Sequence, residues 1–535
     1  MLEYLWLLWL PSAPVMIYFF IRALQNHKVY EQKTFNYQTE SAQKIVFQFC
    51  SRNAPQVVYE AITRVHDVCR ILGYTNYRVD LVSDIKVPKE VALKVNAKNV
   101  TVPSDYQTNP PVKYKARALQ YAVEQRKKCA QANSQTWIYL LDEESMVTEQ
   151  CVRALLQYIS NKDAKPIAEG GIIYPNHFFN NNLFCSMSET LRTYVCYDCV
   201  TQMSSGKMPT HMHGSNLLVR SDIEAQVGWA YQKLDLSEDQ RFGWEATLKL
   251  GEGIFGWHGG TIEEQPARSL RDLLEQRQRW FVGSIHNLQN AKIPLQQKIT
   301  ISIRWLAWWA GFPAGLATFF ILLIPQAIPS WVQIFLLFNT FTWLIGYQVG
   351  LRLILKKYRL PKHKAVLWHL ATLVLTPFVG IVETFPIFIA PLQLRRRYIV
   401  RTPTPKYCGE SHADVLNPKR KTEAYPEDTP QLVFETSPLQ IETEQPQRIS
   451  ARAVRLRKVS AIKDSSDSLN GNYYVLSNSG EDSDGLILLV LLGKKRQNDL
   501  QISVRNGLWQ TEAALAISNS SQKDETEQPQ RISRP

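Results

Sequence analysis

Carboxylates stand at the ends of two strand-like runs of this chain. "YRVDLVSD" ends on Asp84, and "TWIYLLDEE" ends on Asp142, Glu143 and Glu144. Adjacent carboxylates at a strand end can hold a hard divalent cation through oxygen, and such an ion stabilises a departing diphosphate. Asp142 and Glu144 are the candidate ligands, because Glu143 would project differently. Taken singly, each acid could equally be a turn residue or a solvated helix entry.

A second acidic pair lies further along, in "LSEDQRFGW" (236–244). Glu238 and Asp239 stand where a helix is expected to begin, with Ser237 as a suitable cap. A carboxylate beside an acceptor hydroxyl can remove its proton during attack, which is the work of a general base. The alternative is a purely structural role at the helix N-terminus, where negative charge is favourable.

Basic and small residues near these acids could contact an anionic substrate. Lys115 and Arg117 open a helix in "KYKARAL", where they could meet a nucleotide or its phosphates, or simply form a solvated basic face. In "HMHGSNLLVR" (211–220), Gly214 and Ser215 could let a substrate approach the backbone closely.

A polar stretch, "EQRQRW" (275–280), stands about twenty positions before the chain becomes almost wholly apolar. Its tryptophan, Trp280, tolerates a half-wet position, and Arg279 can pair with phosphate. Taken alone, the stretch could be an amphipathic interfacial helix with no catalytic role.

Strand-like and helical segments alternate around these motifs. Thr148 is expected to cap one of the helices, and Gly73 to close another. Such alternation predicts βαβ units, an α/β fold and a largely parallel sheet. Ligands bind beyond the carboxyl ends of the strands in such sheets, which is where Asp84 and Asp142 fall. The expected strands are 44–52, 77–84, 137–144 and 168–175, and the expected helices include 114–128 and 148–160.

The charge balance limits the classes of molecule that the protein is expected to bind. Lys and Arg number 61 against 48 Asp and Glu, a net charge of +13, which suits nucleic acid, an anionic membrane or anionic substrates. Long apolar runs beside Lys/Arg clusters favour the membrane, and no zinc-finger or RNP-type motif supports nucleic acid. The scattered cysteines predict reduced thiols facing a cytosol. A zinc site at Cys196, Cys199, His211 and His213 is conceivable, but the H-x-H spacing departs from the usual finger pattern, and a helix with two incidental thiols is favoured.

Four segments are apolar enough to meet a bilayer. Residues 4–21 carry their positive charge on the C-terminal side, which predicts a retained anchor whose C-terminal end is cytoplasmic. Residues 305–325 and 331–351 are each long enough to span. Residues 366–394 contain prolines and have Lys/Arg clusters on both sides, so a re-entrant or bent hairpin is expected. The region before residue 300 would then face the cytoplasm.

The ordered motifs D84 … K115-A-R-A-L … D142-E-E … E238-D … Q276-R-Q-R-W resemble the membrane-bound, inverting family 2 glycosyltransferases, which include cellulose and hyaluronan synthases. The resemblance covers about residues 40–300 and the flanking membrane segments. "YLLDEESMVTEQCVRALL", "GWEATLKLGEGIFGW" and "SLRDLLEQRQRWFVGSIH" are most similar to the egghead-type β-1,4-mannosyltransferases.

The resemblance implies a GT-A (Rossmann-like) catalytic domain with transmembrane helices at both ends. It implies that Asp239 is the catalytic base and that a divalent cation, Mg²⁺ or Mn²⁺, is bound at Asp142 and Glu144 in place of the usual D-x-D. The remaining expected roles are nucleotide binding by Asp84, Lys115 and Arg117, and acceptor or diphosphate contacts by Glu238, Gly214, Ser215, Gln276, Arg279 and Trp280.

The implied reaction moves a hexosyl group from a cytosolic sugar nucleotide, GDP-mannose or a UDP-sugar, to a lipid-linked or glycolipid acceptor, and forms a β-glycosidic bond. A processive polysaccharide synthase is one alternative, although a polymer channel normally needs more spanning segments. A non-catalytic membrane scaffold or transporter-like subunit is another, and the ordered acids argue against it.

The expected organisation has four parts. An N-terminal anchor (1–25) precedes the GT-A domain (40–298) and a membrane region (300–398), and a low-complexity tail follows (403–535). The tail repeats "TEQPQRIS" and contains a possible small β-rich element at 470–510.

Overall fold

The fold is described from a computed structural model of the chain. Outside the tail, the described residues are 2–31, 35–37, 43–51, 55–83, 95–174, 182–210, 212–232, 236–290, 292–323, 328–358 and 361–393. Within the tail, five short strands are described.

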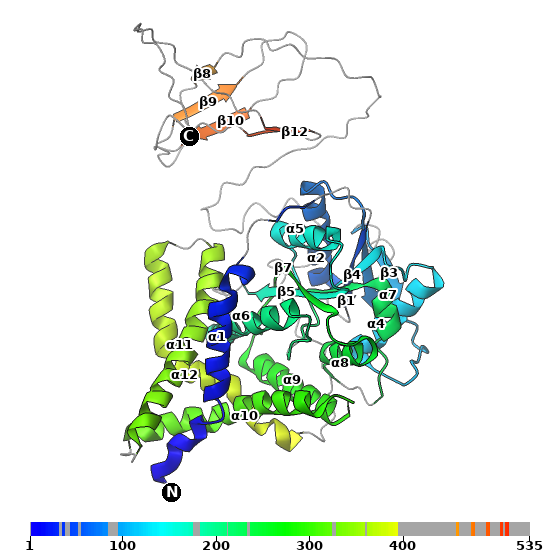
Figure 1. Cartoon of the computed structure of the whole chain (residues 1–535). Coiled ribbons are helices and arrows are strands. Elements are labelled where there is room, and N and C mark those ends of the chain that lie inside the picture. Colours follow the sequence, from blue (N-terminus) through cyan, green and yellow to red (C-terminus); the bar gives the residue numbers. More distant parts are fainter. Residues whose placement is uncertain are drawn as a thin grey trace, which may run out of the picture. The chain divides into compact units, whose positions relative to one another are not determined.

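A seven-stranded mixed sheet forms the centre of the fold, in the order β3-β2-β1-β4-β6-β5-β7 (Figure 1). Only β6 runs antiparallel to its neighbours, β4 and β5. The α/β prediction is therefore confirmed. The strands are β1 (Lys44–Ser51), β2 (Tyr77–Ser83), β3 (Lys98–Thr101), β4 (Thr136–Asp142), β5 (Ile167–Ile173), β6 (Leu217–Arg220) and β7 (Phe255–Glu263).

Helices cover both faces of this sheet, which is why its central strands are apolar throughout. In β1, Phe47 and Phe49 face a core shared with α2 (Pro55–Ile71) and α5 (Glu149–Ser160). Val46 faces the opposite core, which contains residues of α4 (Tyr114–Lys128), α7 (Ser221–Val227) and α8 (Glu238–Leu250). The predicted cap of α5 is confirmed, since the Thr148 side chain accepts a hydrogen bond from the Cys151 amide.

The carboxyl ends of β1 and β4 lie side by side at one edge of the sheet. Their parallel register pairs Cys50 with Asp142, so the acid that ends β4 stands at the rim, as its place in the sequence predicted. β2 ends at Ser83, next to Ser51 of β1. Asp84, which follows it, lies outside the described residues.

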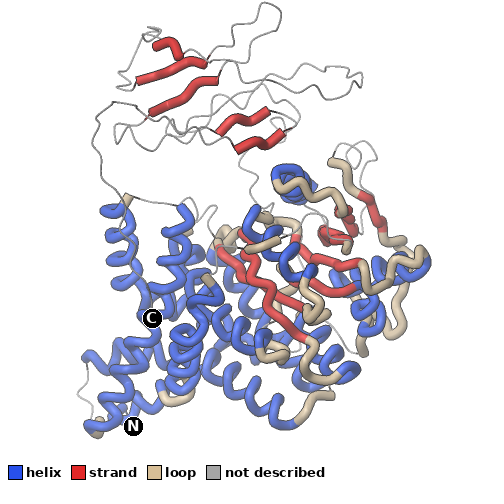
Figure 2. The backbone as a smooth tube through the Cα atoms, turned by 45° about the horizontal axis from the view of Figure 1, so that its top comes forward, coloured by secondary structure: helices blue, strands red, loops and turns tan. Residues whose placement is uncertain are grey.

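A second group of helices packs beside the sheet (Figures 1 and 2). The central member, α6, packs against α1, α11 and α12. At Gly350, the backbone of α11 approaches the backbone of α6 very closely. A Cβ added to this glycine would lie 1.8 Å from the carbonyl oxygen of Thr190. The group contains η1 (Leu2–Trp9), α1 (Ala13–Tyr30), α6 (Leu183–Ser204), α9 (Leu270–Asn290), α10 (Leu295–Leu323), α11 (Ser330–Tyr358), α12 (Lys362–Ile389) and η2 (Ala390–Gln393).

Three helical stretches among the described residues are long and apolar enough to cross a membrane: Trp6–Tyr30, Ser330–Lys356 and Lys362–Leu392. They correspond to the predicted segments 4–21, 331–351 and 366–394. The predicted span at 305–325 lies in α10, which is not one of the three.

The hairpin predicted for residues 366–394 is wrong. Helix α12 runs without a break from Lys362 to Ile389 and includes both Pro377 and Pro386. Prolines are tolerated inside apolar helices that pack among neighbouring helices, and α12 packs against α9, α10 and α11. The prolines therefore do not reverse the chain here.

The C-terminal residues 426–535 form a compact unit separate from residues 1–425. Their described strands pair antiparallel in two small sheets, β10-β9-β8 and β11-β12. The bounds are β8 (Leu456–Lys458), β9 (Asn472–Leu476), β10 (Leu488–Leu492), β11 (Ser503–Asn506) and β12 (Trp509–Glu512). Three strands thus lie within the predicted 470–510 element, β8 precedes it, and β12 overlaps its end.

Candidate active site

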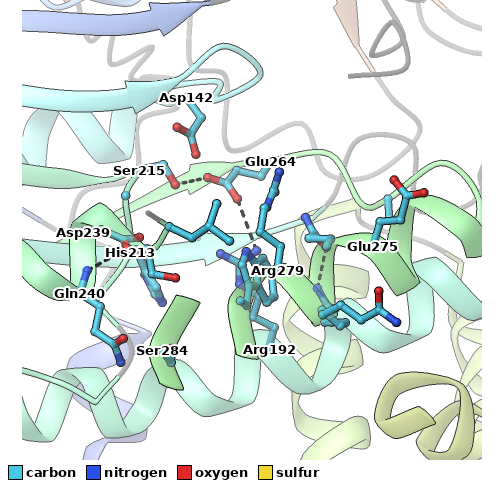
Figure 3. Close-up of a pocket in the computed structure, with 18 of the residues that line it drawn as sticks. Asp142, Arg192, His213, Ser215, Asp239, Gln240, Glu264, Glu275, Arg279 and Ser284 are labelled. Carbon is cyan, nitrogen blue, oxygen red and sulfur yellow. Dashed lines mark hydrogen bonds and ion pairs between the residues drawn. The ribbon is translucent and has the colours of Figure 1, made fainter. Parts of the chain in front are cut away.

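A cavity of about 1120 Å³ opens at the carboxyl ends of β1 and β4. Figure 3 shows Asp142, Asp239 and Glu264 disposed around it. Its wall also includes the loops 212–215 and 264–269, the first turn of α8 and one side of α9. Residues far apart in the sequence therefore share one site, as the position of the acids at strand ends predicted.

Lys115 of α4 joins the two acidic motifs. Its Nζ forms a short ion pair with Oδ1 of Asp142, donates to the carbonyl oxygen of Gly214 at 3.0 Å, and lies 3.9 Å from Oε1 of Glu238. Partial burial would lower the pKa of Lys115, but the Asp142 and Glu238 carboxylates outweigh it and raise that pKa. Lys115 is therefore a cation in the site.

Asp239 stands beside this cation. Its Oδ1 accepts a hydrogen bond from the Gln240 amide at 2.8 Å, and an added Cβ on Gly214 would lie 3.0 Å from its Oδ2. The pKa of Asp239 is raised from 3.8 to about 7. Burial is the largest cause and the neighbouring Glu238 charge the next, and together they outweigh the opposing effect of Lys115. A carboxyl group with this pKa can accept a proton near neutral pH, as a general base must.

The turn before α8 is fixed by α9 rather than by a serine cap. Ser237 has φ 56°, in the left-handed region, and its side chain makes no capping hydrogen bond, so the expected cap is absent. The Asn287 side chain donates to the Ser237 carbonyl oxygen at 3.0 Å. Gly283 of α9 leaves room for the Ser237 side chain, because a Cβ there would lie 2.4 Å from its Oγ. Glu238 and Asp239 are thereby directed into the cavity.

Ser215 belongs to a second cluster of polar residues in the cavity wall. Its hydroxyl donates to Oε1 of Glu264, and Oε2 of Glu264 lies 3.8 Å from Arg192 of α6. Burial raises the pKa of Glu264, although Arg192 opposes the rise. The loop that carries Gly214 and Ser215 is therefore tied to α6 by side-chain contacts.

Trp280 lies under two guanidinium groups. The Cζ atoms of Arg192 and Arg277 are 4.7 Å and 4.5 Å from the centre of its ring, distances at which cation–π attraction operates. Arg277 is buried and pairs with Glu189 of α6 at 3.0 Å and with Glu383 of α12 at 2.7 Å. This arrangement holds α9 against two other helices.

The structure brings most of the predicted site residues to the cavity but not all. Arg117 is directed elsewhere: its guanidinium donates to the carbonyl oxygen of Tyr106 at 3.0 Å, and it does not line the cavity. Its side chain is engaged by the loop after β3, so the structure does not bring it to the cavity, and its nucleotide contact stays a prediction. The predicted residues that do line the cavity are Lys115, Asp142, Glu144, Gly214, Ser215, Glu238, Asp239, Gln276, Arg279 and Trp280.

Sequence reasoning missed Arg192, Glu264 and Arg277. Glu264 directly follows β7, so a strand assignment there would have marked it as a rim acid like Asp142. Arg192 and Arg277 carried no such signal, since each meets its partners through tertiary packing alone.

Asp142 and Glu144 suit an oxygen-ligated divalent cation. Both line the cavity at the end of β4, and Mg²⁺ is commonly held by one or two carboxylates together with substrate phosphates. Among the described residues, no group of three or more His, Cys, Asp or Glu side chains is arranged to hold a metal. Phosphate and water oxygens would have to complete the shell.

His213 adjoins this site within a buried cluster. Its Nε2 lies 4.0 Å from Sγ of Cys196, and its amide donates to Oε1 of Glu169 at 2.5 Å. Burial raises the pKa of Glu169 to about 8. Burial lowers the pKa of His213, but Glu169 and Cys196 together outweigh that effect and raise it to about 9.

Comparison with known proteins identifies what the catalytic region resembles. Residues 137–394 match the model of the family described as "Glycosyl transferase family group 2". The resemblance inferred from the motifs is thus confirmed by an independent match.

Curated relatives agree with that match. Over 268 residues the chain is 26% identical to the β-1,4-mannosyltransferase egh of Drosophila melanogaster, with 48% of this chain and 54% of that protein covered. Over 264 residues it is 28% identical to the β-1,4-mannosyltransferase bre-3 of Caenorhabditis elegans, with 48% and 55% covered. The chain spans about half the length of these relatives.

Solved structures are less similar. The mannosyltransferase PcManGT from Pyrobaculum calidifontis, in complex with GDP-Man and Mn²⁺, aligns with 74% of this chain and 100% of its own, at 11% identity and a TM-score of 0.42. Mannosyl-3-phosphoglycerate synthase from Rubrobacter xylanophilus aligns with 50% of this chain and 85% of its own, at 12% identity and a TM-score of 0.32.

Proposed function

We propose, on the premise that residues 137–394 match glycosyltransferase family group 2, that the protein is an inverting glycosyltransferase. It moves a hexosyl group from a sugar nucleotide to a lipid-linked or glycolipid acceptor. The observation that carries the proposal is a single cavity that holds Asp239, with its pKa near 7, beside the Asp142–Lys115 pair.

The proposed reaction is one direct displacement. Asp239 accepts the proton of an acceptor hydroxyl, whose oxygen forms a bond to the anomeric carbon of the sugar. The bond from that carbon to the diphosphate oxygen breaks, and its electron pair leaves with the nucleoside diphosphate. One displacement turns an α-linked donor into a β-glycoside. A base whose pKa lies near the working pH is suited to this transfer.

The diphosphate is proposed to lie near Asp142 and Glu144. A Mg²⁺ or Mn²⁺ ion held there would neutralise charge on the leaving group. Lys115 supplies a fixed positive charge in the same region, and Arg279 lines the same cavity from α9. Electrostatic stabilisation of a departing anion by such groups is commonly a large part of catalysis.

The apolar part of the cavity wall supports a lipid-bearing acceptor. It includes Met16 and Phe19 of α1 and Trp305 and Trp308 of α10. Helix α1 lies within one of the stretches long and apolar enough to cross a membrane. A sugar attached to an alkyl chain would place its head near Asp239 and its chain along these apolar side chains.

GDP-mannose is the first donor to test, because the curated relatives are β-1,4-mannosyltransferases, and UDP-sugars are the alternative. We further propose that the catalytic region faces the cytoplasm, where sugar nucleotides are made. The positive charge that follows the N-terminal apolar segment supports this orientation.

The test uses the purified full-length protein in detergent. Nucleoside diphosphate release is measured from a panel of GDP- and UDP-sugars, with Mg²⁺, Mn²⁺ or chelator, and with alkyl glycosides or extracted lipids as acceptors. We expect acceptor-dependent release from one donor and a β-linked, lipid-extractable product. A product with the α-configuration, or no release from any donor, would contradict the proposal.

A further inference from the structure

Lys115 occupies a position between the elements that would bind the donor and the cation. Its ammonium group contacts Asp142 from β4, the Gly214 carbonyl oxygen at 3.0 Å and, more distantly, Glu238 of α8 at 3.9 Å. Three separate elements thus converge on one positive charge. The Lys115 side chain is only 22% exposed, so water screens these contacts poorly.

This position conflicts with a divalent cation at the same carboxylate. A metal ion on Asp142 would compete with the ammonium group for carboxylate oxygens and would be repelled by its charge. Within the described part of the chain, moreover, no third His, Cys, Asp or Glu completes a metal site. The protein alone therefore offers a divalent cation a poor site.

A bound nucleoside diphosphate would make the site more favourable for a divalent cation. It carries negative charge and oxygen ligands, so it can pair with the Lys115 ammonium group and also coordinate a cation held by Asp142 and Glu144. The space around Lys115 suits such an exchange, because Gly214 presents no side chain: a Cβ there would lie 3.0 Å from Lys115 Nζ.

We infer that Lys115 is a resident cation that holds Asp142 until the donor binds, and that it thereby couples divalent-cation binding to donor binding. The inference rests on the proposed function and extends it to the order in which the site is filled. By thermodynamic linkage, the nucleotide and the cation must strengthen each other's binding by the same factor.

The test measures Mn²⁺ binding to the purified full-length protein by electron paramagnetic resonance, with GDP or UDP at saturation and without nucleotide. In the unmodified protein, we expect the nucleotide to tighten Mn²⁺ binding by about tenfold or more. Lys115→Met should tighten Mn²⁺ binding by about tenfold in the absence of nucleotide. The factor by which nucleotide tightens Mn²⁺ binding should then be about tenfold smaller than in the unmodified protein.

Two further variants make the result specific. Lys115→Arg keeps the charge and should retain weak Mn²⁺ binding that the nucleotide strengthens. Lys128→Met removes a positive charge from the exposed end of the same helix and should behave as the unmodified protein. If Lys115→Met does not fold, as judged by its thermal transition, Lys115→Gln replaces it.

The outcomes separate the inference from the function on which it rests. Nucleotide binding together with unchanged coupling in the Lys115→Met protein would overturn the inference and leave the proposed function standing. Failure of the unmodified protein to bind GDP, UDP or Mn²⁺ under any condition would instead overturn the proposed function and, with it, the inference.

Discussion

Replacement of Asp239 by asparagine should have two opposite effects, loss of turnover and a more stable fold. The raised pKa of Asp239, from 3.8 to about 7, means that ionisation of this carboxyl group costs free energy in the folded protein. Asparagine has nearly the same shape and never ionises, so it removes that cost. Its amide cannot accept the proton of an attacking hydroxyl.

The magnitude follows from the pKa. A tenfold change in an equilibrium constant is worth about 1.4 kcal/mol, so a rise from 3.8 to about 7 corresponds to an upper limit of about 4 kcal/mol. Asp239 faces the cavity and keeps some contact with solvent, which screens the charge, and we therefore expect about 2 kcal/mol in the unfolding free energy.

The stability difference between the Asp239→Asn and unmodified proteins should depend on pH. Below about pH 4, Asp239 is protonated in both the folded and the unfolded protein, so the variant gains nothing. As the pH rises towards 7, the unfolded protein loses its proton while the folded protein retains it, and the stability of the unmodified protein falls. The advantage of the asparagine variant should grow over this range and level off above about pH 7.

The assay is thermal unfolding of both proteins in the same detergent from pH 4.5 to 8.5. Asp163→Asn is the matched control, because Asp163 is exposed in a turn and the substitution should leave the melting temperature unchanged at every pH. A melting-temperature difference between the Asp239→Asn and unmodified proteins that does not vary with pH, or a variant less stable at pH 8, would refute the reasoning.

Three other perturbations follow from the same contacts. The kcat/KM for the donor should rise about tenfold for each pH unit below about 7 and level off above it, as the Asp239 carboxyl loses its proton; a flat profile between pH 5 and 8 would contradict this assignment. Gly214→Ala, whose Cβ would lie 3.0 Å from both Asp239 Oδ2 and Lys115 Nζ, should lower kcat by roughly tenfold to a hundredfold, with little change in melting temperature. Arg277→Met removes the ion-pair partner of buried Glu383 and leaves buried Glu189 with its longer, 4.0 Å contact to Arg192, so it should destabilise the fold by about 3–5 kcal/mol. The exposed Arg70→Met control should change stability by no more than about 0.5 kcal/mol, and equal melting temperatures for these two variants would argue against the buried network.

Local patterns in the sequence were sufficient to place part of the site. The run "TWIYLLD" is apolar enough to be a buried strand, so the position of Asp142 at its carboxyl end could be predicted. Thr148 could be recognised as a cap because its partner is three residues away. The start of α8 at Glu238 was predicted as well, although the Ser237 cap expected there is absent.

Contacts between distant segments could not be predicted in this way. Ser215 and Glu264 are 49 residues apart, and Arg277 and Glu383 are 106 residues apart. Nothing in the spacing of these residues indicates that they meet, because strand order and helix packing bring them together. The antiparallel placement of β6 between β4 and β5 is a tertiary feature of the same kind.

The membrane region shows how local rules can mislead. Two prolines and flanking positive charge suggested a chain reversal in residues 366–394, yet α12 continues through both prolines. Packing against α9 and α10 and the buried Arg277–Glu383 pair hold this helix in place. Such tertiary contacts outweigh the local preference of proline to break a helix.

The role of Asp239 is tested most directly by single-turnover transfer of labelled sugar to an alkyl glycoside, with nucleotide affinity measured in parallel. For Asp239→Asn we predict a loss of transfer rate on the order of a thousandfold, with a nucleotide Kd close to that of the unmodified protein. Transfer at the unmodified rate by this variant would contradict the account.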